Sequence, residues 1–392
     1  MLLYGTFTVS ANSPQNFTAK IRLLCLQESR QRFANKLRTM TKPVGIALIG
    51  TGGIAQGAHL PVYQKLQDEG KVKIVALCDI KEDVLRTVSA KYGTAQTFTD
   101  YTEMLRLTEI DAIDVCTPNY LHKQPVIDSF AAGKHVLCEK PLAINAVEGE
   151  AMVAAGHAAG KKFQVGLNMR FAAAPQAIKR FADDGVFGEI YYARAQALRR
   201  RGVPSWGVFT QKDKQGGGPL IDIGVHILDL TLWLMGHPKP VSATGMAHTK
   251  FGHKEGVYNT WGAWDPKIFT VEDFATGFVR FENGATLTLE SSFIANGNDA
   301  YVTQLYGTEG GVFVDPVNAG NTKIFREESR SLSDSTLAAL PNLNSHEEEI
   351  RAFVQAIADD TPVAVTGEQG LMVTRLLDAI YESSETGREV RF

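Results

Sequence analysis

The stretch that decides the fold is Val44-Gly-Ile-Ala-Leu-Ile49, followed directly by Gly50-Thr51-Gly52-Gly53-Ile54-Ala55. The first six residues are an apolar run between Pro43 and a glycine, which is typical of a buried parallel strand. Gly50 would allow a tight turn, Gly52 would let the backbone approach a pyrophosphate at the next helix, and Ala55 would permit close packing of that helix on the strand. The pattern predicts a dinucleotide-binding turn over residues 50–55, with a purely structural turn as the alternative.

A second predicted strand supports a nucleotide site because it ends in an acidic residue. Residues 72–78 form another apolar run, and Asp79 follows it. An acidic side chain at this distance from the glycines accepts hydrogen bonds from the adenosine ribose and repels a 2′-phosphate. No arginine follows immediately, so NAD is favoured as the cofactor and NADP is less expected. The alternative is that Asp79 caps the helix that starts near Lys81.

The alternation of strand and helix continues to about residue 167. Apolar runs at residues 111–116, 135–138 and 163–167 are separated by helix-like stretches. Such alternation predicts a parallel sheet that binds its ligand at the carboxyl ends of the strands. We therefore expect a Rossmann domain over residues 43–167. The cofactor-binding residues expected beyond the glycine turn and Asp79 are Thr117, Pro118, Asn119, His122, Glu139 and Lys140.

After about Arg170 the pattern changes from alternating strands and helices to longer strands. The elements expected here are strands at 189–197, 273–282 and 285–294 and helices near 346–359 and 367–383. Asn283-Gly284 fits a two-residue hairpin turn between the last two strands. An antiparallel or mixed sheet follows, so we expect residues 168–392 to form a second α/β domain.

A glycine run and a helix between these strands carry candidate chemistry. Residues 216–218 are three glycines, which would let the chain approach a ligand closely. Asp222 and His226 are four residues apart and would share a helix face, with Asp229 one turn further on. A histidine paired with a carboxylate accepts a hydroxyl proton while its orientation is held. A metal site and a satisfied core histidine are the alternatives, and no further His or Cys stands nearby at ligand spacing.

A basic and aromatic loop precedes the glycine run and is expected to overhang the pocket. It contains three consecutive arginines at 199–201 and then Trp206. We expect Arg200 to donate to substrate hydroxyls and Trp206 to pack on the C–H face of a pyranose, with a structural loop as the alternative. Asn168 and Arg170 are further candidates for substrate binding. An isolated arginine triplet is poor support for nucleic-acid binding.

The composition is that of an ordinary globular chain, with 392 residues, 44% hydrophobic residues, and 40 basic against 43 acidic residues. The slight negative charge offers no general attraction for nucleic acid or anionic lipid, and no apolar run is long enough to predict a membrane span. The chain has four cysteines and no CxxC pair. Cys78, Cys116 and Cys138 each end an apolar run, which indicates buried thiols in a reducing compartment such as the cytoplasm.

The N-terminal segment differs from the rest. Residues 1–39 contain six basic residues and one acidic residue, and their apolar residues fall roughly on one helical face. We expect residues 1–42 to be an extension outside the folded domains, with Met40 as the native start. A basic amphipathic extension and an organelle presequence are the alternatives.

The motifs together resemble those of the glucose–fructose oxidoreductase/inositol dehydrogenase (Gfo/Idh/MocA) family. They are Gly50-Thr-Gly-Gly-Ile-Ala55, Glu139-Lys-Pro141, Asp222-x-Gly-x-His226-x-x-Asp229 and Trp233-Leu-x-Gly236, in this order. The resemblance covers residues 43–392. It implies that Lys140 is the catalytic lysine, His226 the acid/base and Asp222 the third polar member, with Lys140, Asp222 and His226 also contacting substrate. It further implies a large open sheet in the second domain that forms a homodimer or homotetramer.

The function expected from these residues is hydride transfer between nicotinamide and a secondary alcohol of a sugar, glycoside or cyclic polyol. Such an enzyme would be an NAD-dependent oxidoreductase without a metal, in the cytoplasm. One alternative is an NAD-requiring glycosidase that oxidises the sugar transiently, eliminates the aglycone and reduces the sugar again. The other alternative is a non-catalytic, dinucleotide-binding regulatory protein.

Overall fold

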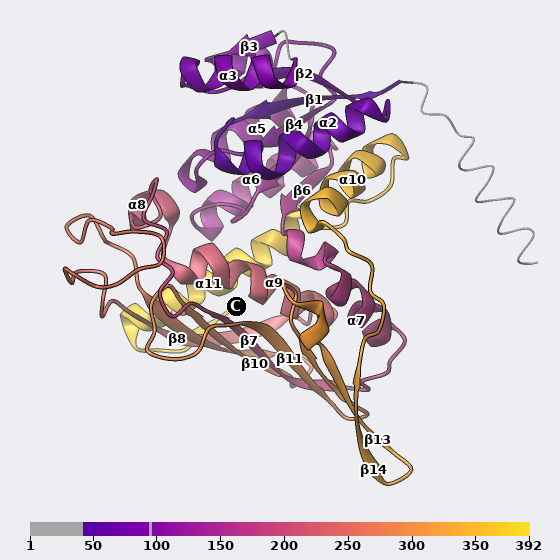
Figure 1. Ribbon diagram of the computed structural model, residues 1–392, viewed down its shortest axis with the longest axis vertical. Helices are drawn as coiled ribbons and strands as arrows, with labels where there is room; N and C mark the ends of the chain where they lie inside the picture. The colour runs from indigo at the N-terminus through magenta and orange to yellow at the C-terminus, as the bar shows by residue number, and fades with distance from the viewer. Residues whose placement is uncertain (1–41, 94–95) are drawn as a thin grey trace, which may run out of the picture. The chain divides into compact units, whose positions relative to one another are not determined.

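The computed structural model describes residues 42–93 and 96–392, and Val44–Phe392 forms a compact unit of its own (Figure 1). The expectations for residues 1–41, including a start at Met40, lie outside the described residues. The predicted fold is confirmed: a parallel Rossmann sheet comes first, and a larger, mostly antiparallel sheet follows it.

The first sheet, sheet A, has six parallel strands in the order β3-β2-β1-β4-β5-β6. The strands are β1 (Val44–Ile49), β2 (Val72–Cys78), β3 (Gln96–Phe98), β4 (Ala112–Val115), β5 (His135–Glu139) and β6 (Phe163–Gly166). All six residues of β1 are buried, as expected for a central strand covered on both faces. The expected boundary between residues 167 and 168 falls just after β6.

The helices of the first half follow the strands, as βαβ units require. They are η1 (Ala55–His59), α2 (Leu60–Asp68), α3 (Glu82–Tyr92), α4 (Tyr101–Met104), η2 (Asn119–Leu121), α5 (Lys123–Ala131) and α6 (Ala146–Ala159). Helix α6 begins where the Asn145 side chain accepts a hydrogen bond from the Glu148 amide, and it ends at Gly160 in the left-handed conformation. The segment η1 is a π-helix placed directly after the glycine turn.

The second sheet, sheet B, has nine strands in the order β14-β13-β12-β11-β7-β10-β9-β8-β15. The strands are β7 (Ile190–Leu198), β8 (Pro240–His248), β9 (Phe274–Phe281), β10 (Thr286–Ser292), β11 (Ala300–Gly307), β12 (Gly311–Val314), β13 (Lys323–Glu328), β14 (Ser331–Thr336) and β15 (Val390–Arg391). Strands β7 and β10 pair in parallel, and the other neighbours within the described ranges pair antiparallel.

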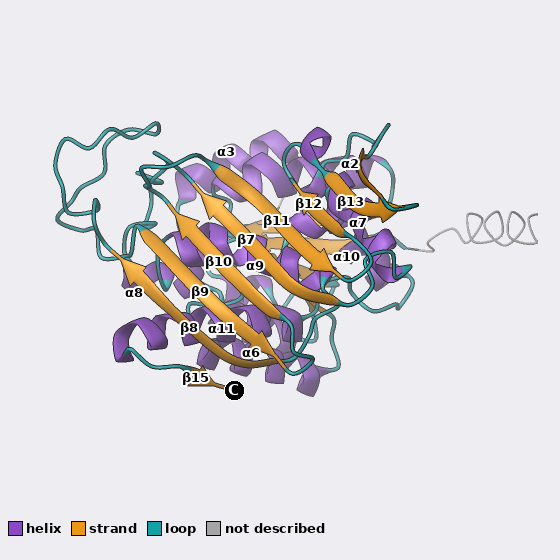
Figure 2. Ribbon diagram, turned by 90° about the horizontal axis from the view of Figure 1, so that it is seen from below, coloured by secondary structure: helices purple, strands orange, loops and turns teal. Residues whose placement is uncertain are grey.

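Helices pack on one face of sheet B. Those of the second half are η3 (Asn168–Phe171), α7 (Ala173–Asp183), α8 (Lys212–Gln215), η4 (Leu220–Gly224), α9 (Val225–Leu234), η5 (Ala319–Asn321), α10 (Ser345–Ala358) and α11 (Gly367–Thr386). In Figure 2 the strands β8, β9, β10, β7 and β11 lie in front, and α9 and α11 lie behind them. Helix α11 contacts β8 on one side and β6 with α6 on the other, so it joins the two sheets.

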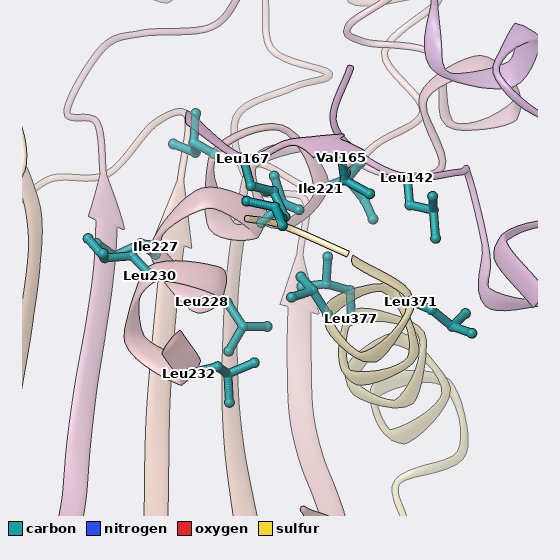
Figure 3. Close-up of a cluster of buried hydrophobic side chains, with 14 of the residues drawn as sticks. Leu142, Val165, Leu167, Ile221, Ile227, Leu228, Leu230, Leu232, Leu371 and Leu377 are labelled. Atoms are coloured by element: carbon teal, nitrogen blue, oxygen red, sulfur yellow. The ribbon is translucent and has the colours of Figure 1, made fainter. Parts of the chain in front are cut away.

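A continuous apolar core holds the two sheets together (Figure 3). It contains Leu142 and Leu167 from loops at the carboxyl end of sheet A, together with side chains of α9 and α11. Leu371 and Leu377 of α11 and Val165 of β6 belong to this same cluster. Because the core is shared, residues at the carboxyl ends of sheet A are held at fixed positions relative to η4 and α9.

The turn between β9 and β10 differs from the predicted two-residue hairpin. The Phe281 amide donates to the Ala285 carbonyl, and the Gly284 amide donates to the Phe281 carbonyl. Three residues, 282–284, therefore form the loop, and Gly284 adopts a φ of 84°. This is a type I turn closed by a left-handed glycine, which is the usual three-residue solution.

One stretch, Lys212–Leu234, has the length and mean hydropathy that a membrane span requires. Its most apolar window is 89% buried inside the protein. It comprises α8, η4 and α9, which pack against sheet B and α11. The burial identifies this stretch as a core helix.

Candidate active site

A cavity of about 410 Å³ opens at the carboxyl ends of β1, β2 and β4. It is lined by Ile49, Gly50, Gly52, Cys78, Asp79, Ile80, Lys81, Val84, Thr99, Tyr101, Cys116, Thr117, Pro118, Tyr120, Leu121 and Pro125. Parallel α/β sheets bind their ligands at this place because the strand order reverses there and leaves a crevice. Gly50, Gly52, Asp79, Thr117 and Pro118, all predicted to bind the cofactor, line it.

The glycines of the turn have separate roles that fit a dinucleotide. Gly50 has a φ of 92°, and a Cβ atom there would lie 2.7 Å from the Cys116 carbonyl oxygen, so the protein itself requires glycine. A Cβ atom on Gly52 would meet no heavy atom within 4 Å. The space beside Gly52 is therefore open on the cavity side, as close approach by a pyrophosphate needs. Gly53 and Ile54 are exposed, whereas Ala55, the first residue of η1, is fully buried.

Asp79 is held in the cavity wall by backbone and hydroxyl donors. The Thr51 amide and hydroxyl donate to Asp79 Oδ2 at 2.8 and 3.0 Å, and the Lys81 amide donates to Oδ1 at 3.0 Å. These bonds fix the carboxylate at the end of β2. A carboxylate has about four lone-pair sites, so acceptor capacity for ribose hydroxyls remains.

Two of the predicted cofactor residues point away from the cavity. The Asn119 side-chain amide donates to the Gln215 carbonyl at 3.0 Å. His122 is fully buried, with its ring nitrogens 2.9 Å from the carbonyl oxygens of Pro141 and Thr117. These contacts favour a structural role for both side chains. They argue against the predicted position of the two side chains beside the nicotinamide ring.

Lys140 and Asp222 meet at the junction of the two halves. Lys140 follows β5, and its Nζ donates to Asp222 Oδ1 at 3.0 Å and to the Asp222 carbonyl at 2.9 Å. Asp222 lies in η4, and His226 lies one turn later, at the start of α9. Lys140 and Asp222 are the two charged groups that most affect the His226 ring. The fold thus brings the three predicted catalytic residues together.

The His226 ring is unlike that of a core histidine with satisfied hydrogen bonds. Its Nδ1 atom is buried and has no hydrogen-bond partner within the described residues. Burial and, next to it, the Lys140 ammonium together lower the pKa of His226 to about 3. The ring is therefore neutral at physiological pH and carries a free lone pair, which a proton acceptor requires.

Asp222 remains ionised beside Lys140. Burial alone would raise the pKa of this carboxyl, but the cations of Lys140 and Arg199 lower it below its usual range. Arg199 NH1 lies 3.6 Å from Asp222 Oδ2. An ionised carboxylate between two cations orients the amine of Lys140 toward the same helix face that carries His226.

The glycine run has a different cause from the one expected. A Cβ atom on Gly216 would lie 2.6 Å from the Ile144 carbonyl oxygen. A Cβ atom on Gly217 would lie 1.9 Å from the Tyr381 hydroxyl, and one on Gly218 would lie 2.2 Å from the Glu272 carbonyl oxygen. Contacts with the protein itself therefore require all three glycines.

Glu272 anchors the start of the helix that carries Asp222. Its carboxylate accepts hydrogen bonds from the amides of Gly218 and Leu220 at 2.9 and 3.0 Å and from the Tyr381 hydroxyl at 2.9 Å. The first amides of a helix lack partners within the helix, so a carboxylate at this place satisfies them. The position of Asp222 depends on this anchor.

Arg170 and Asn168, both predicted to bind substrate, are committed to other contacts. Arg170 is 2% exposed and makes a two-pronged pair with Asp229 through Nε at 2.8 Å and NH2 at 2.5 Å. Its NH1 donates to Gln369. Asn168 donates its amide to Ser345 Oγ at 2.9 Å. These contacts favour a structural role for Arg170 and explain why Asp229 does not join the site.

Arg199 takes the place that was predicted for Arg200. The Arg200 side chain is exposed, and its backbone amide donates to Asp299. The Arg199 guanidinium lies 4.8 Å from the Trp261 ring centre and faces Asp222. The Trp261 ring is 5.5 Å from that of Trp206, which is 55% exposed.

Three further residues that were not predicted from the sequence lie at or near the site: Arg199, Trp261 and His346. His346, the second residue of α10, accepts a hydrogen bond from the Asn168 amide at 3.3 Å and affects the His226 ring electrostatically. Arg199 could have been selected because it stands next to the alternating strand β7, whose direction fixes its side chain. Trp261 and His346 lie far away in the sequence, and no local pattern marks them.

Family models match both halves of the chain. Residues 44–167 match the oxidoreductase family with an NAD-binding Rossmann fold, and residues 179–392 match the C-terminal alpha/beta domain of that oxidoreductase family. The chain belongs to the Gfo/Idh/MocA oxidoreductase family. The resemblance drawn from the motifs is confirmed, and so is the expectation that the protein is an oxidoreductase.

Two relatives and one solved structure match this family member over almost their whole lengths. The D-glucoside 3-dehydrogenase of Escherichia coli is 33% identical over 89% of this chain and 98% of its own. The myo-inositol 2-dehydrogenase of Thermotoga maritima is 27% identical over 88% of this chain and 98% of its own. The crystal structure of an oxidoreductase domain protein from Kribbella flavida superposes with a TM-score of 0.80 at 26% identity, over 90% of this chain and 99% of that one.

Proposed function

We propose that this protein transfers hydride between NAD(H) and a secondary alcohol of a sugar, glycoside or cyclic polyol. Lys140 and His226 form the polar and acid–base pair, and Asp222 orients Lys140. The observation that carries the proposal is the junction itself: the Lys140 ammonium, directly after β5, lies 3.0 Å from the Asp222 carboxylate. His226, one helical turn later, has a neutral ring whose Nδ1 has no hydrogen-bond partner among residues 42–93 and 96–392.

The side chains at this junction can supply the proton transfer and the charge stabilisation that oxidation of an alcohol needs. When bound, the cofactor would provide the hydride acceptor. His226 takes the hydroxyl proton because its ring is neutral and only partly buried, so that an unprotonated ring nitrogen is available to the substrate hydroxyl. Lys140 donates a hydrogen bond to the same oxygen and stabilises the negative charge that develops on it. In the reverse direction His226 returns the proton.

NAD is the proposed cofactor, and Asp79 is the reason. Its carboxylate is fixed in the cavity wall by Thr51 and Lys81. There it would accept bonds from both ribose hydroxyls and repel the 2′-phosphate of NADP. Thr117 and Pro118 would contact the cofactor from the opposite wall.

Among the candidate substrates, a D-glucoside is our first choice. The E. coli relative is named for that substrate class and shares 33% identity with this chain. The two tryptophan rings near Arg199 support a pyranoside because an aromatic face packs well on the C–H face of a sugar ring. Inositols and sugar acids complete the panel to be tested.

The test is an assay of NADH formation with glucosides, inositols and sugar acids, run on the wild type and on Lys140→Ala and His226→Ala. We expect each variant to bind NAD and to lose about 10²–10⁴-fold in kcat, since positioned acid–base groups contribute this much. Lys73→Ala, an exposed lysine on β2, is the matched control and should keep wild-type turnover. Full activity in both catalytic variants would refute the assignment.

The same assay separates the two other function classes. A glycosidase that oxidises and re-reduces its sugar would release aglycone without accumulating NADH. A regulatory protein would bind NAD and turn over no member of the panel. Net NADH production that depends on Lys140 supports the dehydrogenase.

Assembly and location are part of the proposal. We propose a homodimer or homotetramer through the face of sheet B that is opposite α9 and α11, where Tyr306 is 40% exposed beside Tyr192 (Figure 2). Light scattering after size-exclusion chromatography tests this, and a monomer at micromolar concentration would contradict it. Cys78, Cys116 and Cys138 are buried free thiols, which supports a reducing compartment such as the cytoplasm.

A further inference from the structure

A buried ionic cluster lies between the cofactor turn and Lys140. His59, the last residue of η1, is fully buried between two carboxylates. Its Nδ1 lies 2.6 Å from Asp114 Oδ2, and its Nε2 lies 2.9 Å from Glu139 Oε1. Asp114 is on β4 and Glu139 ends β5, so the ring ties η1 to two neighbouring strands.

Glu139 links this histidine to the catalytic lysine. While its Oε1 faces His59, its Oε2 accepts a hydrogen bond from the Lys140 amide at 3.1 Å. A Cβ atom on Gly166 would lie only 3.0 Å from Oε1, so β6 leaves the carboxylate no room on that side. A change in the His59 ring would therefore be passed through Glu139 to the start of Lys140.

Each charged group in this cluster is kept ionised by its oppositely charged neighbours. Burial alone would lower the pKa of His59, but the Asp114 carboxylate raises it well above its usual value. Burial alone would raise the pKa of Glu139, but the hydrogen bond from His59 lowers it to about 2. The ionisable groups that face His59 come from β4, β5, α2 and α10; they are Asp114, Cys116, Glu139, Tyr63, Glu349 and His346. A buried imidazolium with two carboxylate partners is satisfied, whereas either carboxylate alone would not be.

A metal ion is the competing occupant of this place. His59, Asp114 and Cys116 offer ligand atoms that all lie within 4.8 Å of one another. However, both ring nitrogens already face carboxylate oxygens at hydrogen-bond distance. Burial also raises the pKa of the Cys116 thiol to about 12, so it is not a thiolate. Protons therefore account for the geometry better than a metal does.

We propose that His59 is a positioning residue that, through its two carboxylate hydrogen bonds, fixes Lys140 relative to the cofactor-binding turn. The proposal rests on the catalytic role of Lys140 in the proposed function. It differs from a purely structural role because it couples two parts of one reaction: η1 begins where the pyrophosphate would bind, and Glu139 precedes the reacting amine. The ring at the end of η1 sets the distance between them.

The first test is a double-mutant cycle of His59→Gln, Glu139→Gln and both together. We expect each single variant to lower kcat about 10- to 100-fold, with the KM for sugar and the Kd for NAD within about threefold, because a misplaced catalytic group costs this much. The double variant should be no worse than the worse single variant within about twofold, since both act through one bond. His157→Gln, an exposed histidine on α6 that pairs with Glu368, is the matched control and should leave kcat unchanged.

Additive losses in kcat, or losses only in thermal stability, would overturn the proposal. A second readout needs no variant to fold: in wild-type protein labelled with ¹⁵N-histidine, both His59 ring nitrogens should carry protons at about pH 8, where an ordinary histidine has lost one. A neutral ring, or stoichiometric metal in the purified protein, would also overturn it. These outcomes are distinct from failure of the proposed function, in which Lys140→Ala itself keeps full turnover.

Discussion

Lys140 Nζ lies 3.0 Å from Asp222 Oδ1, although the two residues are 82 positions apart and belong to different halves of the chain. The bond closes the junction between β5 and η4, one turn before His226. Because the shared apolar core fixes both elements, the amine and the imidazole are in place before any substrate arrives. Such preorganisation is what converts binding into rate acceleration.

The contrast between Arg199 and Arg200 gives the first prediction. Arg199→Ala should lower kcat/KM for a glucoside by about tenfold or more, because it removes a charge-assisted contact beside Asp222 and unstacks Trp261. Arg200→Ala should stay within about twofold, since exposed side chains without such contacts contribute little. Steady-state kinetics of the two neighbouring variants checks this, and equal effects would count against Arg199.

The pH dependence of His226 gives the second prediction. Burial and Lys140 lower its pKa to about 3, so the folded protein keeps the ring neutral where the unfolded chain would protonate it, below about pH 6.5. His226 should therefore destabilise the folded protein at acidic pH, that is, lower its free energy of unfolding. This effect should vanish above about pH 6.5. Urea denaturation of wild type and His226→Asn at several pH values measures this difference.

The acid limb of kcat/KM for alcohol oxidation provides the matching kinetic measurement. Protonation of His226 in the free enzyme should begin well below about pH 6.5, so this limb should lie on the acidic side of an ordinary histidine. A break near the ordinary histidine pKa, abolished only in the His226 variant, would contradict the placement of the ring.

Asp79 gives the third prediction, on cofactor choice. Asp79→Ser should lower kcat/KM for NAD by about 10- to 100-fold, because the hydrogen bonds that the ribose hydroxyls would donate to a charged carboxylate are lost. The same variant should improve the use of NADP, because repulsion of the 2′-phosphate is removed. Asp83→Ser, on the exposed first turn of α3, is the control. An unchanged NAD-to-NADP ratio in Asp79→Ser would rule out ribose recognition by this carboxylate.

The pair of Arg170 and Asp229 gives the fourth prediction. Arg170→Met should cost about 3–5 kcal/mol of unfolding free energy, because it leaves the buried Asp229 carboxylate without its partner. The double variant Arg170→Met/Asp229→Leu should recover most of that loss. Urea denaturation provides the energies. Turnover per folded molecule should change little, and a specific rise in KM instead would restore Arg170 as a substrate ligand.

The Rossmann half was predictable because its signals are local. The residues of β1 and β2 form short apolar runs, and Gly50 and Asp79 stand at fixed distances from their ends. The positions of β8 and of β11 to β14 were not predicted. Their burial alternates only in part, and their register is set by neighbours far along the chain.

For the candidate site, too, local motifs could be predicted from the sequence, whereas contacts between distant residues could not. Lys140, Asp222 and His226 could be selected since their motifs are local, whereas their contact depends on the shared core. Arg170 looked like a ligand because it follows a strand end, but its long side chain reaches the buried Asp229 instead. Arg199 was passed over for Arg200 because alternation along a strand does not say where the strand stops.

The Glu272 anchor has a practical consequence for redesign. Glu272 binds the amides of Gly218 and Leu220 and lies outside the loop that carries Trp206. The position of the reacting groups therefore depends on contacts other than those of the loop that would contact the sugar. A library that randomises residues 203–209 and 258–262 while keeping 216–218, Glu272 and Tyr381 intact should retain turnover in many members. New sugar preferences could then be selected without rebuilding the chemistry.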